Sequence, residues 1–578
     1  MEPIEFFSSP QTISQKQYEA LRMFFIENRT ASEVAQKFGY TYRGFTTIVS
    51  NFRKELRESR DEGLYFKELK HGRREVGSET KNTIIGLRKK YYSVEDIKVT
   101  LDSKGFNISE KSIYNIIREQ GFARLPRRQK LTKKSLEPAG FMADKTVALA
   151  FGPESFKSGS AGVLCLLPYI KKYGISEIIQ TSDFPETNQI SKLSSILAFI
   201  ALKSSNVRRY TADDRWCIDR GLGLFAGLNV LPKAAWFSSY SHRVTKEMNF
   251  KFLKGLHANW QALGMLGDTS NLDFTTVPYW GENDHLENNW SGKRSKALAS
   301  MLAVLAQDPD SGIIDYGNTN VMHKNESAVV LEFIDFYGKD PKGKRDLRYL
   351  TFDSKFTNYE NLSKLDDDQI KFVTIRRRGK NIVDRLNSLP KNKWKTVHVE
   401  RAGNKKAAIK VLDEVVFLKG YNKEIRQISI TGHGKVKPAT IITNEFDLSI
   451  EQIVRKYARR WIVEKSISEQ IEFFHLNSVS SSMVIKVDFD LTMSIVTHNL
   501  FRLFALDTDR YMHNADQSIY EKFLDNSGEI KIGKNKISVQ LKKKRTLPLI
   551  LEKTNNYAGQ KYEWLNNLEI NFTGATNS

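Results

Sequence analysis

The stretch VRKYARRWIVEKSISEQIEFFHL, residues 454–476, contains no proline or glycine and predicts a helix. At about 3.6 residues per turn, one stripe of this helix combines aromatic and aliphatic side chains with a single carboxylate. Its members are Tyr457, Trp461, Glu464, Ser468, Ile471 and His475. Because an unpaired buried charge is costly, Glu464 needs a partner. Arg460, one turn earlier, is one candidate, and a bound cation is another.

The composition favours a large protein with a polyanionic partner. The chain has 578 residues, enough for several domains, and Lys plus Arg outnumber Asp plus Glu by 89 to 67, a net charge of +22. Nucleic acid is the first expected partner, and an anionic membrane surface is the second. The acidic first ten residues lack an apolar signal core, and the apolar run 161–170 is too short to span a bilayer, so we expect a cytoplasmic protein without membrane insertion. Two cysteines exclude a disulfide framework and a cysteine-rich zinc site.

Residues 1–135 carry a local basic surplus, with 27 Lys and Arg against 17 Asp and Glu. Within them, residues 30–56 have two short helical patterns separated by a turn at Gly39, which is the spacing of a helix-turn-helix. The second of these helices would meet DNA base edges through the side chains at its start. Those side chains are Thr41, Tyr42, Arg43 and Thr46.

A similar arrangement recurs in residues 92–122, with a turn at Gly105 and Ser109 as the N-cap of the second helix. The segment 123–134 that follows contains six cations and can contact a phosphate backbone. Its basic side chains include Arg127, Arg128 and Lys130. The competing interpretations are ordinary helical hairpins and a solvated linker. We therefore predict a tandem helix-turn-helix DNA-binding region with a basic linker in residues 1–135.

The rest of the chain divides by its pattern into four parts. Residues 136–265 predict a helical region for packing, dimerisation or DNA contact. Residues 266–378 alternate strands and helices in the order strand, hairpin, helix, strand, helix, strand, which predicts a mixed α/β sheet. Residues 379–447 show strand-like alternation and predict a β-rich insertion. Residues 448–578 then form the second part of the core and a C-terminal region.

Three acids stand out by their contexts. Asp273 lies within the first strand of the α/β part, Asp353 ends a later strand, and Glu464 lies in the apolar stripe. The first and fourth strands of such a sheet are usually neighbours, so the three carboxylates can converge. Converging carboxylates repel one another unless hard divalent cations bind between them. The alternatives are an ion pair of Glu464 with Arg460 and helix capping by Asp353, and Asp268 is a rival first acid.

Three segments together resemble the DDE transposases of bacterial insertion sequences. They are NLDFTTVPYWGE (271–282), TFDSKFTNYENL (351–362) and YARRWIVEKSISEQIEFFHLNSVSS (457–481). The last contains the pattern Tyr-x2-Arg-x3-Glu, and the similarity covers most of residues 210–550. The resemblance implies an RNase H-like core with a β-rich insertion before the catalytic Glu.

The resemblance also implies site residues and chemistry. Asp273, Asp353 and Glu464 match the catalytic triad that binds Mg²⁺, for which Mn²⁺ can substitute, and Tyr457 and Arg460 match a pair that contacts DNA phosphates. The family reaction is hydrolysis of phosphodiester bonds at the element ends, followed by joining of the 3′-OH ends to target DNA.

Double-stranded DNA, as terminal repeats and target, and a second copy of the chain in a synaptic complex are the partners that the resemblance implies. The implied location is the bacterial cytoplasm, at the nucleoid. One position departs from the family pattern, because Ile471 stands where the signature has a Lys. Two other classes are compatible with the sequence: a catalytically silent DNA-binding regulator, and an RNase H-like nuclease that cuts without joining.

Overall fold

The computed structural model describes a large part of the chain, and the structural statements below concern that part. The described residues are 13–58, 76–90, 92–103, 106–123, 125, 153–187, 189–207, 216–279, 286–291, 296–319, 321–339, 346–377, 379–401, 405–432, 438–460, 473–476 and 484–575. The chain forms two compact units, Met1–Gly77 and Ser78–Ser578.

The described residues of the first unit form three helices, α2 (Ile13–Phe25), α3 (Ala31–Phe38) and α4 (Tyr42–Glu58). Thr30 and Glu33 form a capping box that starts α3, and Gly39 ends α3 in the left-handed conformation that glycine adopts without strain. The buried side chains at the centre of the unit are Ala20, Leu21, Val34, Ala35, Phe45 and Val49. The two helices and the turn predicted around Gly39 are therefore present, and their DNA-binding role stays a prediction.

A second group of three helices begins the larger unit: α5 (Ser78–Lys89), α6 (Val94–Ser103) and α7 (Glu110–Glu119). Ser109 is the N-cap of α7, because its side chain accepts a hydrogen bond from the backbone N–H three residues later. The predicted cap is confirmed, whereas the predicted turn residue Gly105 lies outside the described residues.

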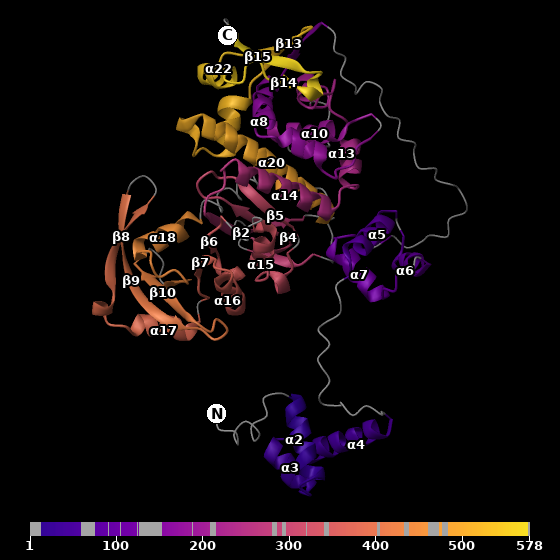
Figure 1. Ribbon diagram of the computed structural model, residues 1–578, viewed down its shortest axis with the longest axis vertical. Helices are drawn as coiled ribbons and strands as arrows, with labels where there is room; N and C mark the ends of the chain where they lie inside the picture. Colours follow the sequence, from indigo (N-terminus) through magenta and orange to yellow (C-terminus); the bar gives the residue numbers. More distant parts are fainter. Residues whose placement is uncertain are drawn as a thin grey trace. The chain divides into compact units, whose positions relative to one another are not determined.

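A ten-stranded sheet forms the α/β part of the larger unit (Figure 1). Its order is β3-β4-β2-β6-β7-β11-β10-β9-β8, with β5 also paired to β4. Strand β6 runs parallel to both β2 and β7, and the remaining pairs are antiparallel, so the predicted mixed α/β sheet is confirmed. The strands are β2 (Thr269–Pro278), β3 (Asn288–Ser291), β4 (Lys296–Gln307), β5 (Ile314–Asn318), β6 (Tyr349–Phe352), β7 (Lys371–Ile375), β8 (Lys395–Arg401), β9 (Lys405–Phe417), β10 (Glu424–Thr431) and β11 (Ala439–Thr443).

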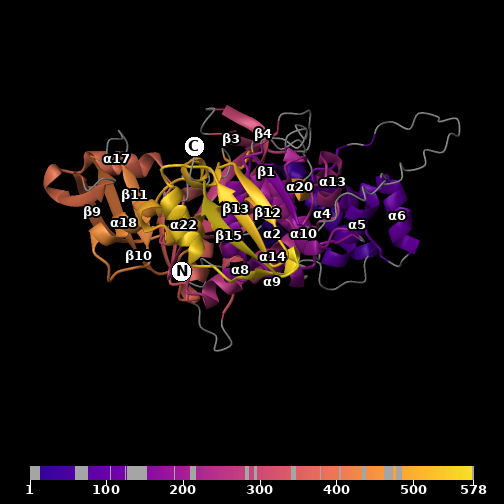
Figure 2. The same ribbon diagram turned by 90° about the horizontal axis from the view of Figure 1, so that it is seen from above.

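The strands β8 to β11 come from the stretch predicted to be β-rich, and its strand content is as expected. These strands continue the ten-stranded sheet, because β11 pairs with β7 through the residues Thr443 and Val373. Figures 1 and 2 both show β9 and β10 at the end of the sheet remote from α20 (Val484–Asp507). That this stretch is an inserted domain stays a prediction.

Helices pack against this sheet. They are α15 (Val329–Tyr337), α16 (Tyr359–Asp367), α17 (Lys380–Ser388) and α18 (Ile450–Arg459). Helix α18 contacts β6, β7 and β8, and its buried Ile453 joins a hydrophobic cluster with strand residues such as Val411 and Ile428. The end of α18 is therefore held close to the ends of β2 and β6.

The region 136–265 is mainly helical in its described part, but it also contains the strand β1 (Glu154–Ser158), which the sequence analysis did not predict. Strand β1 pairs with β12, so it is the edge strand of a C-terminal sheet in the order β1-β12-β13-β15-β14 (Figure 2). The helices of this region are η2 (Ala161–Leu166), α8 (Leu167–Lys172), α9 (Ile175–Thr181), α10 (Lys192–Ser204), α12 (Arg220–Phe225), α13 (Ala234–Ser241) and α14 (Lys246–Ala262).

The C-terminal region shares one hydrophobic core with those helices and with the sheet. Its long helix α20 contacts α10, α14 and β5 along its length. The other elements are α21 (Asp516–Ile519), η9 (Tyr520–Leu524), β12 (Gly528–Ile532), β13 (Lys536–Leu541), α22 (Leu547–Asn555), β14 (Lys561–Tyr562) and β15 (Leu568–Gly574). Cys165 and Cys217 are both buried and form no disulfide. No helix in the described ranges is long and apolar enough to cross a membrane.

The helix predicted for residues 454–476 is wrong at its C-terminal end. Residues 473–475 form a turn, and His475 has a φ of 55° that no right-handed helix accommodates. Phe473 and Phe474 are both almost completely buried, in contact with Phe501, and consecutive residues of a helix would point to different sides. The turn buries both rings at once, which a continued helix would not do, so the helix predicted from the sequence pattern does not extend through Phe473 and Phe474.

We expect the Asp488→Ala substitution to lower the free energy of unfolding by about 3 kcal/mol, measured by urea unfolding with tryptophan fluorescence. Asp488 is 5 % exposed and accepts hydrogen bonds from Asn249 (2.8 Å) and Thr319 (2.7 Å), so its loss leaves two buried donors without an acceptor. Asp384→Ala, at an exposed position of α17, is the control and should change stability by less than about 0.5 kcal/mol. Equal effects would contradict this structural role.

Candidate active site

The strands β2 and β6 bring two of the predicted acids together. Their parallel pairing ends with Leu272 opposite Phe352, and Asp273 and Asp353 are the next residue on each strand. Neighbouring strands lie about 4.8 Å apart, so the two acids are neighbours at the point where the β2–β6 pairing ends. The expected side-by-side position of the first and fourth strands is present.

Asp273 is nearly buried, with 7 % of its surface exposed, and its charge is compensated. One carboxylate oxygen accepts a hydrogen bond from the backbone N–H of Phe274 at 2.8 Å. The other forms an ion pair with the guanidinium of Arg460, whose side chain is also buried. Arg460 is the C-cap residue of α18, so this ion pair joins the helix to the strand.

Tyr457 lies next to the same charges. Burial chiefly raises the pKa of its hydroxyl to about 12, and the negative charges of Asp353 and Asp273 act in the same direction, whereas the Arg460 side chain opposes them. The guanidinium carbon of Arg460 lies 5.4 Å from the centre of the tyrosine ring. Tyr457 therefore remains protonated at neutral pH and can donate a hydrogen bond.

Asp353 occupies the N-cap position of the short helix η5 (Ser354–Phe356), but its side chain makes no capping hydrogen bond. Helix capping therefore does not occupy this carboxylate. The loop that follows is held in place, because the Phe356 ring stacks on Phe274 at a centroid distance of 4.0 Å. Arg377 also donates a hydrogen bond to the carbonyl of Ser354 at 3.1 Å.

Two further basic side chains anchor the last turn of α18, and the sequence analysis did not assign them this role. Lys456 donates to the hydroxyl of Thr269 at 3.0 Å and lies 3.8 Å from the centre of the Tyr349 ring. Arg459 donates to the carbonyl of Pro309 at 2.9 Å. Basic residues at the end of a helix are common for reasons of local charge, so nothing in the sequence marks these contacts.

The rival acid Asp268 lies away from this site. It is exposed, accepts a hydrogen bond from the Thr269 hydroxyl at 2.6 Å, and precedes β2. It lies five positions before Asp273, a distance of about 17 Å along an extended strand. Its backbone carbonyl instead accepts hydrogen bonds from Arg348 and Tyr349, both at 2.8 Å.

Several predicted site residues lie outside the described part of the chain. They are Glu464, Arg127, Arg128 and Lys130, together with the departing position Ile471. Arg43 is described, and it belongs to the other compact unit, exposed in the first turn of α4. Its backbone carbonyl accepts hydrogen bonds from the hydroxyls of Thr46 (3.0 Å) and Thr47 (2.9 Å).

The carboxylates at the end of the β2–β6 pairing are suitable ligands for divalent cations. The described residues contain no group of three or more His, Cys, Asp or Glu that could hold a metal ion. The predicted third ligand, Glu464, lies outside those residues. Asp273 and Asp353 supply the carboxylate oxygens that Mg²⁺ prefers, and Asp273 already holds a positively charged group in the form of Arg460.

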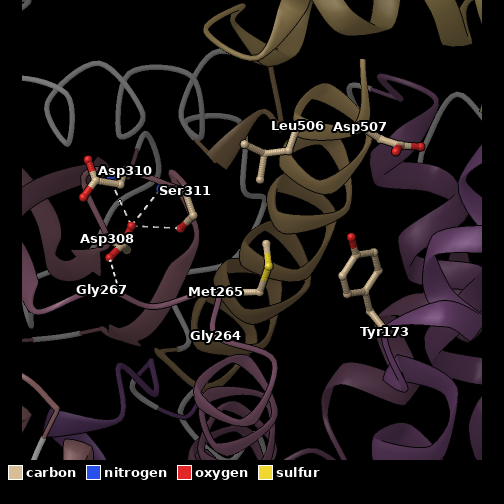
Figure 3. A pocket seen from close by; sticks show the side chains of 9 residues that line it. All are labelled: Tyr173, Gly264, Met265, Gly267, Asp308, Asp310, Ser311, Leu506 and Asp507. Atoms are coloured by element: carbon tan, nitrogen blue, oxygen red, sulfur yellow. Dashed lines mark hydrogen bonds between the residues drawn. The ribbon is translucent and has the colours of Figure 1, made fainter. Parts of the chain in front are cut away.

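A pocket elsewhere in the larger unit carries acidic residues without the features of this site (Figure 3). Asp308 on one side accepts hydrogen bonds from the backbone of Gly267 (2.7 Å) and Ser311 (2.7 Å). Asp507 on the other side accepts a hydrogen bond from the Tyr169 hydroxyl at 2.7 Å. These carboxylates are engaged in holding loops and helices together, so the pocket has a structural explanation.

Residues 269–500 match the family model described as "Transposase DDE domain". This match supports a DDE transposase. The matched range begins at the first residue of β2 and extends into α20, so it contains the paired strand ends with Asp273 and Asp353. A comparison with curated proteins found no match.

A solved structure with similarity to the chain is the cryo-EM structure of the piggyBac transposase synaptic complex with hairpin DNA. The identity is 13 % and the TM-score is 0.33, over 63 % of this chain and 80 % of that one.

The buried ion pair predicts strong coupling between its members. We expect Arg460→Ala to lower the free energy of unfolding by about 3–5 kcal/mol, because Asp273 is left buried without a cation. The double variant Asp273→Ala/Arg460→Ala should lose less than the sum of the two single losses, by more than about 1 kcal/mol. Urea unfolding of the three variants and the parent chain measures the difference.

Arg459→Ala is the matched control. Arg459 immediately precedes Arg460 and pairs with the exposed Asp310. Removal of the Arg459 side chain should lower the free energy of unfolding by no more than about 1 kcal/mol. Additive effects of the Asp273 and Arg460 substitutions would show that the two side chains are not coupled.

Proposed function

We propose that the chain is the transposase of a bacterial insertion sequence, which cuts phosphodiester bonds at the element ends and joins the 3′-OH ends to target DNA. One observation carries the proposal: β2 and β6 place Asp273 and Asp353 side by side next to Arg460, inside the range that matches a transposase DDE domain. The strand order β5-β4-β2-β6-β7, with β6 and β7 parallel to β2, supports an RNase H-like core.

Asp273, Asp353 and Glu464 would hold the metal ions, Mg²⁺ or in its place Mn²⁺. When bound, two such ions activate a water or hydroxyl nucleophile and stabilise the leaving oxygen. The ion pair of Asp273 with Arg460 shows that this carboxylate already accepts a positively charged partner. A role as metal ligand would explain why Glu464 occurs in the apolar stripe of the sequence pattern.

Tyr457 and Arg460 would position the scissile strand. A planar guanidinium donates two parallel hydrogen bonds to phosphate oxygens, and the protonated Tyr457 hydroxyl can donate a third. Asp273 would hold both a cation and the guanidinium of Arg460 near the scissile strand, and Arg460 would direct its donors to the phosphate. Lys456 and Arg459 hold α18 in place through their contacts with Thr269 and Pro309.

The N-terminal helices would recognise the terminal repeats. Helix α4 starts with exposed side chains, among them Tyr42 at 60 % exposure and Arg43, as the recognition helix of a helix-turn-helix does. The basic segment that contains Arg127, Arg128 and Lys130 would contact the phosphate backbone, consistent with the net charge of +22. A homodimer that holds two element ends at the bacterial nucleoid completes the proposal.

Substitution of the acids tests the chemistry. We expect Asp273→Asn, Asp353→Asn and Glu464→Gln each to reduce Mg²⁺-dependent cleavage of linear DNA carrying the element end by about a thousandfold, because several kcal/mol of charge stabilisation is lost. A gel assay measures cleavage and joining, and an anisotropy assay checks that DNA binding is kept. Asp268→Asn is the matched control and should retain cleavage.

The outcomes separate the candidate classes. Cutting and joining by the parent chain, both absent from the three variants, agrees with the transposase. Cutting without joining would identify a nuclease, and binding without cutting would identify a regulator. Equal cleavage by the parent chain and the Asp353→Asn variant would remove this carboxylate from the active site.

Recognition of the element end has its own test. We expect Arg43→Ala to weaken binding of the terminal repeat by about 1–3 kcal/mol while binding of unrelated DNA changes little, because a base contact is lost. Arg22→Ala is the control, since Arg22 lies on α2 in ion pairs with Glu19 (3.0 Å) and Glu27 (2.8 Å). An equal loss for both DNA sequences would assign Arg43 to the phosphate backbone instead.

A further inference from the structure

Three basic side chains meet where the second three-helix group joins the rest of the larger unit. Lys89 is the last residue of α5, His242 is the C-cap of α13, and Lys486 lies in the first turn of α20. The Lys89 ammonium donates a hydrogen bond to the carbonyl of His242, and that of Lys486 donates to the Ser238 hydroxyl at 3.1 Å. We call Lys89, His242 and Lys486 the basic cluster.

The members of the basic cluster influence one another. The pKa of His242 is lowered to about 4, first by burial and then by the positive charges of Lys486 and Lys89. Burial and the charge of Lys486 lower the pKa of Lys89 to about 8, and burial lowers that of Lys486. At neutral pH, the two half-buried ammonium groups therefore repel each other.

No described carboxylate contributes to these three shifts. The acids on the neighbouring helices have other partners: Glu247 contacts Asn82 (3.1 Å) and Lys251 (3.3 Å). Asp488 is held by Asn249 and Thr319, and Asp490 pairs with Lys203 at 2.8 Å. Glu79 on α5 is ten residues before Lys89, about 15 Å along the helix axis.

Each ammonium group has three hydrogen-bond donors, and the hydrogen bonds described above use one donor of each. An anion between them would accept the remaining donors and compensate the repulsion. Charge-assisted hydrogen bonds from two ammonium groups are typical of phosphate sites. The exposed Lys90 and Arg243 extend the positive surface next to the cluster.

We propose that the basic cluster binds a backbone phosphate of DNA at the seam between α5 and α13. The inference rests on the proposed function, because it takes DNA as the polyanion that this chain handles. Helix α5 belongs to the second three-helix group, and α13 belongs to the part of the larger unit that contains the candidate active site. A phosphate bound between them would therefore hold DNA against both parts. The cluster thereby adds a contact that neither the recognition helices nor the active site supplies.

The salt dependence of DNA binding tests the site. Binding of the full chain to a fluorescein-labelled duplex that carries the element end is followed by anisotropy between roughly 50 and 200 mM salt. Lys89→Gln and Lys486→Gln should each lower the slope of log affinity against log salt by about 0.9, and weaken binding roughly fivefold to tenfold near 0.1 M salt. Lys486→Arg, which keeps the charge, should restore most of the slope.

Lys251→Gln is the matched control, because Lys251 is exposed on α14 and already paired with Asp183 (3.1 Å) and Glu247. The inference would be overturned if Lys89→Gln and Lys486→Gln had the same slope of log affinity against log salt as the parent chain. A free anion is distinguished by a second measurement, the melting temperature in inorganic phosphate. Stabilisation by phosphate that Lys486→Gln abolishes, with unchanged DNA slopes, would show a free-anion site and overturn the assignment to DNA.

Failure of the inference is separable from failure of the proposed function. Cleavage by the parent chain with unchanged slopes in the variants contradicts only the phosphate site. Absence of cleavage in the parent chain, together with reduced slopes in Lys89→Gln and Lys486→Gln, contradicts only the catalytic proposal.

Discussion

Parallel pairing of β2 and β6 is the constraint on which the candidate active site depends. Parallel strands cannot be joined by a tight turn, so the chain between them forms β3, β4, β5 and α15 before it returns. Because the pairing ends at Leu272 and Phe352, two acids that are 80 residues apart in the sequence become neighbours just beyond its end. The position of α18 across β6 and β7 then decides which side chains meet them.

Buried carboxylates around this sheet have specific side-chain partners. Asp273 is paired with Arg460, and the buried imidazoles of His257 and His498 lie within hydrogen-bond distance of Asp315 (2.9 Å) and Asp516 (2.7 Å). Each of these contacts joins two separate elements, so these polar contacts also fix tertiary positions. The basic cluster at α5 and α13 differs because like charges face one another there, and this difference motivates an external anion.

The helical region and the C-terminal region form one structural body with the sheet. Strand β1 supplies the edge of the C-terminal sheet, and the core that includes Phe199 and Phe489 is continuous across these segments. A region that shares its core with α20 cannot move independently of the helix that packs on β5. The described part of residues 136–265 thus packs against the sheet and the C-terminal region, which is one of the three roles expected for it.

Apart from the short strand β3, the sequence alone determined the order of strands and helices in the α/β part, because alternation and apolar runs of suitable length are local properties. The cap at Ser109 and the turn at Gly39 were equally readable, and Asp273 was correctly expected within a strand. Local pattern could not show that β1 joins β12, since strand partners distant in sequence leave no periodic signal. It also extended a helix through Phe473 and Phe474, where burial of both rings required a turn. The tertiary structure alone decided that Arg460 pairs with Asp273, because a buried carboxylate on β2 needs a cation and α18 brings one to it.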